Sequence, residues 1–287
     1  MKAFQCVAIV GVGLIGGSVG LAVRSRKVAK TVVGAGSRGA TLTAAHKLGA
    51  ISEVAADLKS AVATADLVVV CTPVGSIVEK VREIAPLCRP GTLITDAGST
   101  KAQIVKELDR AAQSDPAWSP DVRFVGSHPL AGNEKKGPEH ARADLFTGRT
   151  VIITPTPRTR SDDRQTLTDF WTALGARVLE MSGAAHDRAL ATTSHLPHLV
   201  AAAIAGSTPD QYVPLTASGW QDTTRIAAGD PLLWQQIMLA NRTHLLAALD
   251  RLTTLLADWR TTLEASDAAA LEGLLSEAKR IRDAAGN

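Results

Sequence analysis

The chain has 287 residues, of which 45% are hydrophobic and 21% are charged. This composition is typical of globular proteins and excludes a disordered or fibrous chain. At about 150 residues per domain, the length predicts two domains. The net charge is only +3, basic residues are interspersed with acidic ones, and 3% of residues are aromatic. We therefore expect no nucleic-acid-binding surface, because such surfaces need clustered basic residues or a platform of aromatic side chains.

The sequence carries no signal for a membrane or for secretion. Its longest apolar runs, such as residues 67–71 and 200–205, are far shorter than the about 18 residues that a membrane span needs. The N-terminus leads into a strand-like segment and a glycine loop, unlike a signal peptide. The three cysteines, Cys6, Cys71 and Cys88, are widely spaced and form no CxxC pair. We expect buried thiols and a cytoplasmic location.

Short β-branched segments alternate with amphipathic ones in the first half of the chain. We expect strands at residues 6–10, 31–33, 67–71, 93–95, 124–125 and 151–153. Helical patterns lie between them, at residues 14–24, 41–48, 76–84 and 101–112. Strands that are almost continuous Val and Ile, separated by helices, indicate a doubly wound parallel sheet covered on both faces. Residues 150–154, 161–174 and 177–181 have the pattern of the last strand–helix–strand unit of that sheet.

The pattern changes after about residue 182, where the strand signals end. Residues 184–206 are rich in alanine and have apolar residues at helical spacing. We therefore divide the chain into an α/β domain at residues 1–182 and an all-helical domain at residues 183–287.

Capping signals define the helices of this second domain. Gly229, Asp230 and Pro231 have the pattern of an N-cap with proline at the first helical position. The helical pattern then continues to about residue 263, a length of ~45 Å if the helix is unbroken. Residues 266–267 cap a last helix that ends near Asp283. A helix this long favours dimerisation through the second domain, with packing that needs no partner as the alternative.

Gly11, Gly13 and Gly16 form a GxGxxG motif directly after a predicted strand and before a predicted helix. The first glycine permits a tight turn, the second lets the backbone approach a pyrophosphate, and the third lets the helix pack on the strand. The helix begins at Leu14 and Ile15 and supplies N–H groups and a positive dipole end. A simple tight turn is the alternative, but the position inside a strand–helix–strand pattern favours a dinucleotide site.

The end of the second predicted strand indicates which nicotinamide cofactor binds. In NAD-dependent proteins an acidic residue there binds the ribose 2′-hydroxyl. Residues 33–38 contain no carboxylate, and Ser37 and Arg38 suit a 2′-phosphate by hydrogen bonding and charge. The sequence therefore favours NADP. A solvated Arg38 in a permissive site, which would also take NAD, is the alternative.

Among the seven histidines, His128 has the most informative position. It follows a short apolar strand and would lie at the carboxyl end of the sheet, where doubly wound folds bind ligands. A neutral imidazole there can take a proton from a substrate hydroxyl as hydride leaves the same carbon. A loop histidine bonded to the backbone fits the spacing equally well.

Three further residues are candidates for substrate contacts. His195 and His198 are three residues apart on a predicted helix and so share one face. No HExxH motif or cysteine accompanies them, so we expect substrate contacts or buried structural histidines and no metal. Arg225 has the chemistry of a carboxylate-binding fork, with an ordinary surface arginine as the alternative. No GxSxG, Walker A or paired-carboxylate motif indicates a hydrolase or a kinase.

Six blocks together resemble the prephenate dehydrogenase family of tyrosine biosynthesis, including its arogenate-using relatives. They are GVGLIGGS (11–18), CTPV (71–74), DAGSTK (96–101), GSHPLAG (126–132), SHLPH (194–198) and GWQDTTR (219–225). The resemblance implies an N-terminal Rossmann domain and a helical C-terminal domain that binds substrate and forms a homodimer. It implies oxidative decarboxylation of prephenate to 4-hydroxyphenylpyruvate, with hydride transfer to NADP or NAD.

The resemblance also implies roles for single residues. His128 would assist deprotonation of the substrate's ring hydroxyl, and Ser99 would support that histidine near the nicotinamide. His198 and Arg225 would hold the substrate, with Arg225 on a carboxylate. Further contacts are implied for His195, Asn133 and Trp234 with the substrate, and for Thr72 and Pro73 with the cofactor. In some relatives the tryptophan matching Trp234 enters the partner's active site.

Three alternatives to prephenate dehydrogenase remain. An arogenate dehydrogenase would give tyrosine directly. A β-hydroxyacid dehydrogenase normally has a catalytic lysine where this chain has His195 and His198. A dinucleotide-binding sensor without catalysis would be expected to lose its catalytic positions, yet His128, His198 and Arg225 are all present.

Overall fold

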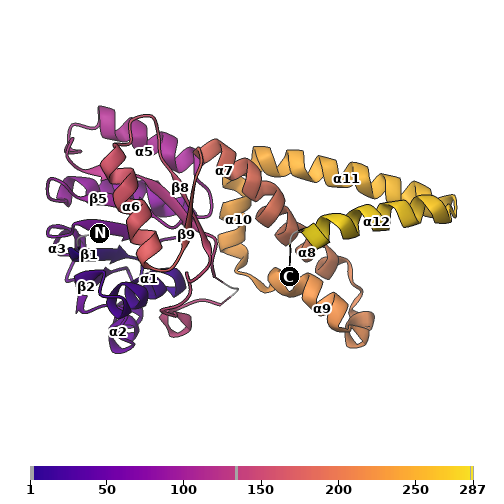
Figure 1. The fold of residues 1–287 in the computed structure, drawn as a ribbon. Coiled ribbons are helices and arrows are strands. Elements are labelled where there is room, and N and C mark those ends of the chain that lie inside the picture. Colours follow the sequence, from indigo (N-terminus) through magenta and orange to yellow (C-terminus); the bar gives the residue numbers. More distant parts are fainter. Residues whose placement is uncertain (1–2, 133–134, 285, 287) are drawn as a thin grey trace. The chain divides into compact units, whose positions relative to one another are not determined.

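The structure is a computed structural model, and it describes residues 3–132, 135–284 and 286. Its internal contacts divide the chain into two compact units, Met1–Asn241 and Arg242–Asn287. The larger unit holds every strand that the structure describes, and the smaller unit is a pair of helices (Figure 1). None of the helices in the described ranges combines the length and the apolar character that a membrane span needs.

The main sheet has six parallel strands in the order β3-β2-β1-β4-β5-β6. These strands are β1 (Phe4–Val10), β2 (Ala29–Ala35), β3 (Glu53–Val54), β4 (Leu67–Val70), β5 (Leu93–Asp96) and β6 (Arg123–Phe124). Doubly wound dinucleotide-binding sheets have this order, in which the chain returns past β1 between β3 and β4. The predicted doubly wound parallel sheet is confirmed.

Helices cover both faces of the main sheet. They are α1 (Leu14–Ser25), α2 (Gly39–Lys47), α3 (Leu58–Val62), α4 (Ile77–Ile84), α5 (Ala102–Ser114) and α6 (Ser161–Ala173). Successive side chains of β1 enter two separate cores, because neighbouring residues of a strand point to opposite faces. Val7 and Ile9 pack with α1 and α6, whereas Ala8 and Val10 pack with α3, α4 and α5. A strand with apolar residues at every position therefore serves both layers.

The last predicted strand–helix–strand unit lies in a second sheet. This sheet has the order β7-β8-β9, with β7 (Gly126–Pro129), β8 (Thr150–Thr154) and β9 (Arg177–Glu180). β7 follows β6 after the single residue Val125 and pairs antiparallel with β8. The prediction that this unit extends the main sheet is wrong, because the chain changes sheets at Val125 and then returns in the opposite direction to form β8.

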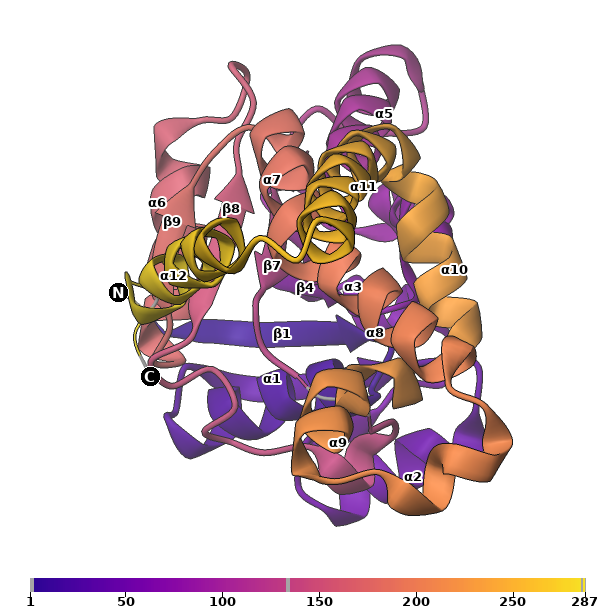
Figure 2. The same cartoon turned by 90° about the vertical axis from the view of Figure 1, so that its right-hand side faces the viewer.

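The remaining helices of the larger unit lie on one side of the α/β layers (Figures 1 and 2). They are α7 (Gly183–Leu190), a π-helical turn (Ala191–His195), α8 (Leu196–Ser207), α9 (Ser218–Thr224) and α10 (Pro231–Ala240). Short 3₁₀ turns occur at Val74–Ser76, Ala85–Leu87, Pro138–His140, Asp210–Leu215 and Arg225–Ala228. The single helix predicted over residues 184–206 is thus two α-helices joined without a gap by the π turn.

The start of α10 agrees with the prediction, but its end does not. The carboxylate of Asp230 accepts hydrogen bonds from the backbone N–H groups of Leu232 (2.8 Å) and Leu233 (3.2 Å), which confirms the N-cap. The predicted unbroken helix to residue 263 is wrong. Helix α10 ends at Ala240, and Asn241 leaves helical geometry with φ −110° and ψ 25°. The side chain of Asn241 is buried and bonded to an earlier segment, which explains the break at this residue.

The smaller unit consists of α11 (Arg242–Glu264) and α12 (Ala268–Ala284), which pack against each other. The backbone N–H of Ala270 donates to the carboxylate of Asp267 (3.0 Å), so the predicted last helix and its cap are confirmed. Several large apolar side chains of this unit are exposed in the single chain: Leu246, Leu255, Leu256, Leu263, Leu275 and Ile281.

Candidate active site

The loop between β1 and α1 has the backbone geometry that the GxGxxG motif predicts. Gly11 has φ +95°, a conformation that side chains rarely adopt, and a Cβ there would lie 2.8 Å from the carbonyl oxygen of Cys71. A Cβ on Gly16 would lie 2.1 Å from the carbonyl oxygen of Gly11. The first and third glycines are therefore required by close packing of the loop, α1 and the end of β4.

The second glycine of the motif differs from the other two. Gly13 is the N-cap of α1, and no side chain caps this helix end. A Cβ on Gly13 would have no atom within 4 Å. Open space beside an uncapped helix N-terminus is the geometry that receives a pyrophosphate, since the first N–H groups of a helix point outward there.

Residues at the ends of neighbouring strands complete this edge of the sheet. Thr72 and Pro73 follow β4, and the hydroxyl oxygen of Thr72 is buried without a hydrogen-bond partner among the described residues. Ser37 and Arg38 follow β2, where both are exposed and Arg38 is the N-cap of α2. An unpartnered buried hydroxyl, an open helix terminus and an exposed cation at one sheet edge fit a dinucleotide phosphate.

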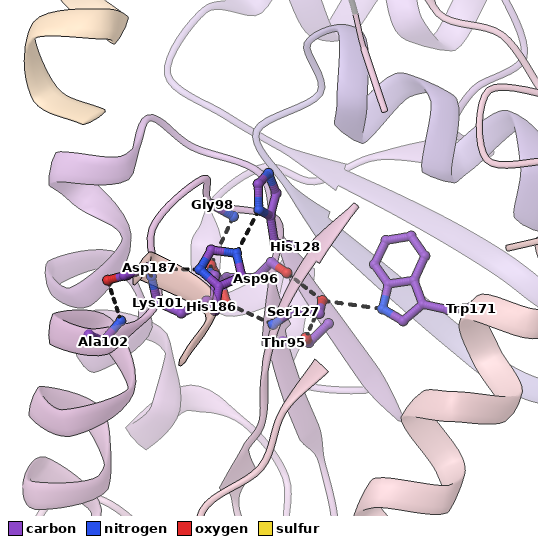
Figure 3. A network of polar contacts seen from close by, with 10 residues as sticks. All are labelled: Thr95, Asp96, Gly98, Lys101, Ala102, Ser127, His128, Trp171, His186 and Asp187. Atoms are coloured by element: carbon purple, nitrogen blue, oxygen red, sulfur yellow. Dashed lines mark hydrogen bonds and ion pairs between the residues drawn. The ribbon is translucent and has the colours of Figure 1, made fainter. Parts of the chain in front are cut away.

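A buried polar cluster fixes the strand that carries His128. The side chains of Asp96 and Lys101 form an ion pair, and both are completely buried. The Asp96 carboxylate also accepts from the backbone N–H groups of Gly98 (2.8 Å) and Ser127 (3.1 Å). The hydroxyl of Ser127 donates to the backbone carbonyl of Asp96 (2.6 Å) (Figure 3). These bonds join the end of β5 to the start of β7, one residue before His128.

His128 begins a chain of hydrogen bonds that leads away from the sheet. Its Nδ1 lies 2.8 Å from Nε2 of His186, and Nδ1 of His186 lies 2.7 Å from the carboxylate of Asp187. That carboxylate also accepts from the backbone N–H groups of Lys101 (2.7 Å) and Ala102 (2.9 Å) at the start of α5. In Figure 3 the second ring nitrogen of His128 points away from His186. This nitrogen, Nε2, is therefore outside the hydrogen-bond chain to His186.

The surroundings of His128 keep it neutral. Burial is the largest effect that lowers its pKa well below 6.5, and electrostatic interaction with the nearby His186, Lys101 and His195 side chains lowers it further. Burial opposes ionisation of Asp187, but hydrogen bonds from His186 and from the backbone of Ala102 and Lys101 outweigh it and lower the pKa of this carboxyl. At neutral pH the site therefore holds a neutral imidazole and an ionised carboxylate.

A second histidine, His195, is linked through Asn241 to the segment that carries Asp187. Nδ1 of His195 lies 3.0 Å from the side-chain nitrogen of Asn241, which also donates to the backbone carbonyl of Asp187 (2.6 Å). Burial lowers the pKa of His195 to about 4, although the nearby Asp187 carboxylate opposes this shift. His195 is thus a second buried neutral imidazole, held by the residue that separates α10 from α11.

His198 and Trp234 form a flat surface on the helical side of the site. Their rings are stacked, with centroids 3.5 Å apart and planes 15° apart. Nδ1 of His198 is buried without a hydrogen-bond partner among the described residues, and burial lowers the pKa of this histidine. Both residues belong to the same chain, so in this structure Trp234 packs on its own His198.

Comparison with known proteins decides the family of this chain. The family model for the nucleotide-binding domain of prephenate dehydrogenase matches residues 19–180, and the model for its dimerization domain matches residues 182–277. The chain belongs to the prephenate dehydrogenase family.

Individual relatives agree with the family assignment. A cyclohexadienyl dehydrogenase from Zymomonas mobilis is 34% identical over 289 residues, which cover 98% of this chain and 96% of the relative. A prephenate dehydrogenase from Bacillus subtilis is 34% identical over 284 residues, 96% of this chain and 75% of the relative. The crystal structure of prephenate dehydrogenase from A. aeolicus with hydroxyphenyl propionate and NAD+ has a TM-score of 0.88 and 30% identity, covering 97% of each chain.

Within this prephenate dehydrogenase fold, some implied contacts are present and others are not. His128, His195 and His198 are buried, and Trp234 is half-buried and stacks on His198. No hydrogen bond between the described residues joins the Ser99 hydroxyl to His128, whose partner is His186 instead. Arg225 is exposed, in a turn that packs on α8. Asn133 lies outside the described residues.

Several residues of this site were not predicted from the sequence. His186, Asp187 and Asn241 come from α7 and from the break after α10, and only tertiary packing brings them to His128 and His195. Asp96 and Lys101 do lie in the DAGSTK block, where an acid and a base inside an apolar context signal a buried ion pair. Among the described residues, no group of three or more His, Cys, Asp or Glu side chains is placed to hold a metal ion.

Proposed function

We propose that the protein catalyses the oxidative decarboxylation of prephenate to 4-hydroxyphenylpyruvate with NAD(P), and that His128 is its general base. The observation that carries this proposal is the neutral His128 ring at the carboxyl end of β7. Its Nδ1 is engaged by His186, while Nε2 points away from that bond. A neutral imidazole with one nitrogen outside the hydrogen-bond chain can accept a hydroxyl proton at neutral pH.

The chemistry of prephenate fits a site of this kind. When bound, NAD(P) accepts the hydride from the carbinol carbon of the ring. His128 takes the hydroxyl proton, which helps the hydride to leave. The bond to the ring carboxylate then breaks, its electron pair completes the aromatic ring, and carbon dioxide departs. His128 returns its proton to the phenolate oxygen. Because aromatisation makes the sequence strongly downhill, the protein mainly orients the substrate and handles one proton.

Residues at the sheet edge are proposed to hold the cofactor. Gly11, Gly13 and Gly16 shape the loop, and the N-terminal N–H groups of α1 at Leu14 and Ile15 bind the pyrophosphate. Thr72 and Pro73 line the end of β4. Ser37 and Arg38 bind the 2′-phosphate, which makes NADP the favoured cofactor. The absence of a carboxylate at residues 33–38 supports this preference, because no acidic side chain there accepts from a free 2′-hydroxyl.

Residues of the helical segments are proposed to hold the substrate. His195 and His198 line the site, Trp234 provides a stacking surface on His198, and Arg225 binds a carboxylate. Ser99 is proposed to support His128, and Asn133, which lies outside the described residues, is proposed to contact the substrate.

We propose prephenate as the preferred substrate because two buried carboxylates of the site are already engaged. Asp96 and Asp187 both accept several N–H groups of the protein, and Asp96 is also paired with Lys101. Carboxylates engaged in this way are not available to bind the ammonium group that distinguishes arogenate.

A homodimer through residues 183–287 is also proposed. It is supported by the dimerization-domain match and by the exposed apolar side chains of α11 and α12. The division of the chain at residue 182 and a cytoplasmic location stay predictions.

Steady-state turnover tests the proposal. Purified protein is given prephenate or arogenate with NADP or NAD, and both the reduced nicotinamide and the aromatic product are measured. We expect 4-hydroxyphenylpyruvate and carbon dioxide in equal amounts with prephenate, and a lower kcat/KM with arogenate. Preference for arogenate would replace prephenate as the substrate, and no turnover of either would refute the assignment of activity.

A further inference from the structure

The position of the proton on His128 decides whether this residue can act as a base. A neutral imidazole carries one proton, on Nδ1 or on Nε2, and only the unprotonated nitrogen accepts another. In His128 the nitrogen facing away from the protein network is Nε2. The residue is a base toward a substrate only when its proton sits on Nδ1.

The hydrogen-bond chain behind His128 specifies that proton. Ionised Asp187 only accepts hydrogen bonds, so Nδ1 of His186, 2.7 Å away, must carry a proton. A His186 ring that carries only this proton has no proton on Nε2, so this nitrogen accepts. Nδ1 of His128, 2.8 Å from it, must therefore donate, which leaves Nε2 of His128 unprotonated. The order of donors along the chain is fixed from the carboxylate outward.

We propose that His186 and Asp187 are positioning residues that hold His128 in the Nδ1–H form and so direct the lone pair of Nε2 at the substrate. This inference rests on the proposed function of His128 and adds two residues to it. The opposite form of His128 would place two unprotonated nitrogens 2.8 Å apart in a buried site, and buried polar atoms left without a partner are costly.

The surroundings of the pair support a positioning role. His186 is completely buried and Asp187 is 2% exposed, so water does not compete for their bonds. Asp187 is anchored by the backbone N–H groups of Lys101 and Ala102 at the start of α5, and its own carbonyl accepts from Asn241. The Asp187 end of the hydrogen-bond chain is therefore held in place, and the carboxylate also stabilises the imidazolium that forms when His128 takes a proton.

Replacing His186 separates this role from simple packing. His186→Leu fills a similar volume but offers no acceptor to His128. His186→Gln keeps a side-chain oxygen that can accept from Nδ1–H. His46→Gln is a matched control, because His46 is exposed on α2 and bonds to the backbone carbonyl of Ser52. Thermal unfolding of each variant shows whether it is folded before it is compared.

Nitrogen NMR of histidine-labelled protein gives a readout independent of catalysis. The His128 signals are identified by their loss in His128→Asn. We expect Nδ1–H and a bare Nε2 in the wild type, the same pattern in His186→Gln and His46→Gln, and a shift toward Nε2–H in His186→Leu. A wild-type His128 protonated on Nε2, or an unchanged pattern in His186→Leu, would overturn the proposal.

Kinetics of the same proteins give the second readout. In His186→Leu we expect kcat to fall by about tenfold or more, since a base in the wrong tautomer is impaired, while KM for prephenate and cofactor stays nearly constant. His186→Gln should recover most of the loss, and His46→Gln should match the wild type. Equal kcat in the leucine and glutamine variants would overturn the positioning role. If the wild type turns over neither prephenate nor arogenate, the proposed function fails, and the NMR comparison still decides the tautomer.

Discussion

The cofactor end and the histidine end of the candidate active site are built in different ways. At the cofactor end, the site is a backbone loop of six residues. The loop can take this shape because Gly11, Gly13 and Gly16 have no side chains. At the histidine end, the working groups are side chains from β5, β7, α7, α8 and α10, which are far apart in sequence. The first region is specified by local geometry, and the second by hydrogen bonds between distant segments.

This difference determines how each region responds to mutation. A glycine loop fails when an added atom has no space, so the effect of each substitution follows from the nearest neighbour. A histidine chain fails when a donor or acceptor is lost, even if the shape of the side chain is preserved. The predictions below use substitutions that act on one region and leave the other intact.

The largest effect is expected at His128. His128→Asn keeps a polar side chain and removes the base, so kcat should fall by about 10²–10⁴. The glycine loop is untouched, so cofactor affinity measured by titration calorimetry should be retained. A variant with kcat near that of the wild type would show that another group handles the proton.

Two alanine substitutions in the glycine loop should separate folding from binding. Gly16→Ala would place a Cβ 2.1 Å from the Gly11 carbonyl oxygen, so the loop must shift and stability should fall by about 1–3 kcal/mol. Gly13→Ala has open space around its Cβ and should unfold like the wild type while binding cofactor about tenfold more weakly. Denaturant unfolding and cofactor titration measure the two effects. Equal loss of stability in both variants would contradict the separate roles.

Cofactor choice should depend on a single exposed side chain. We expect kcat/KM for NADP to exceed that for NAD by about tenfold, since a charge-assisted hydrogen bond contributes ~1.5–3 kcal/mol. Arg38→Ala should remove most of this preference and leave the NAD kinetics nearly unchanged. Gly36→Asp should reverse the preference, and the nearest atom to a Cβ there is in Leu42, 3.9 Å away. Equal weakening of both cofactors by Arg38→Ala would show that the arginine does not read the phosphate.

Acid stability should depend on a buried histidine. The pKa of His195 is lowered from 6.5 to about 4, so the unfolded chain binds its proton first. Its contribution to stability is complete above pH 6.5 and is lost as the pH falls toward 4, at about 1.4 kcal/mol per pH unit. Denaturant unfolding between these pH values should show a shallower slope in His195→Gln than in the wild type. Parallel curves would mean that His195 is not buried as a neutral ring.

Local patterns were sufficient for most of the fold. The parallel sheet, the glycine loop and the Asp230 cap follow from neighbouring residues, and each agrees with the structure. Two elements could not be predicted in this way. The hydrophobic pattern of residues 150–181 indicates strands, but it does not indicate with which sheet they pair. The helical pattern continues through Asn241, because the break depends on bonds to Asp187 and His195.

The same limit applies to the site. His128 and the glycines were identified because their chemistry is tied to a strand end, whose position is a local property. His186 has no such marker. Its role depends on Asp187 beside it and on His128, which lies 58 residues away in sequence. Conversely, Ser99 was assigned by resemblance alone, and its role beside His128 stays a prediction.

Because of the π turn at Ala191–His195, the orientation of the residues that follow depends on the number of residues in this turn. An α-helix turns by about 100° per residue, so the one extra residue of a π turn rotates everything after it relative to α7. His195 is the last residue of this turn and contacts Asn241, and His198 lies three residues beyond it and stacks on Trp234. Deleting Thr193 would restore regular helical hydrogen bonds and turn both rings away from their present partners. At this point the number of residues in the helix, rather than the identity of any side chain, determines the direction in which His195 and His198 point.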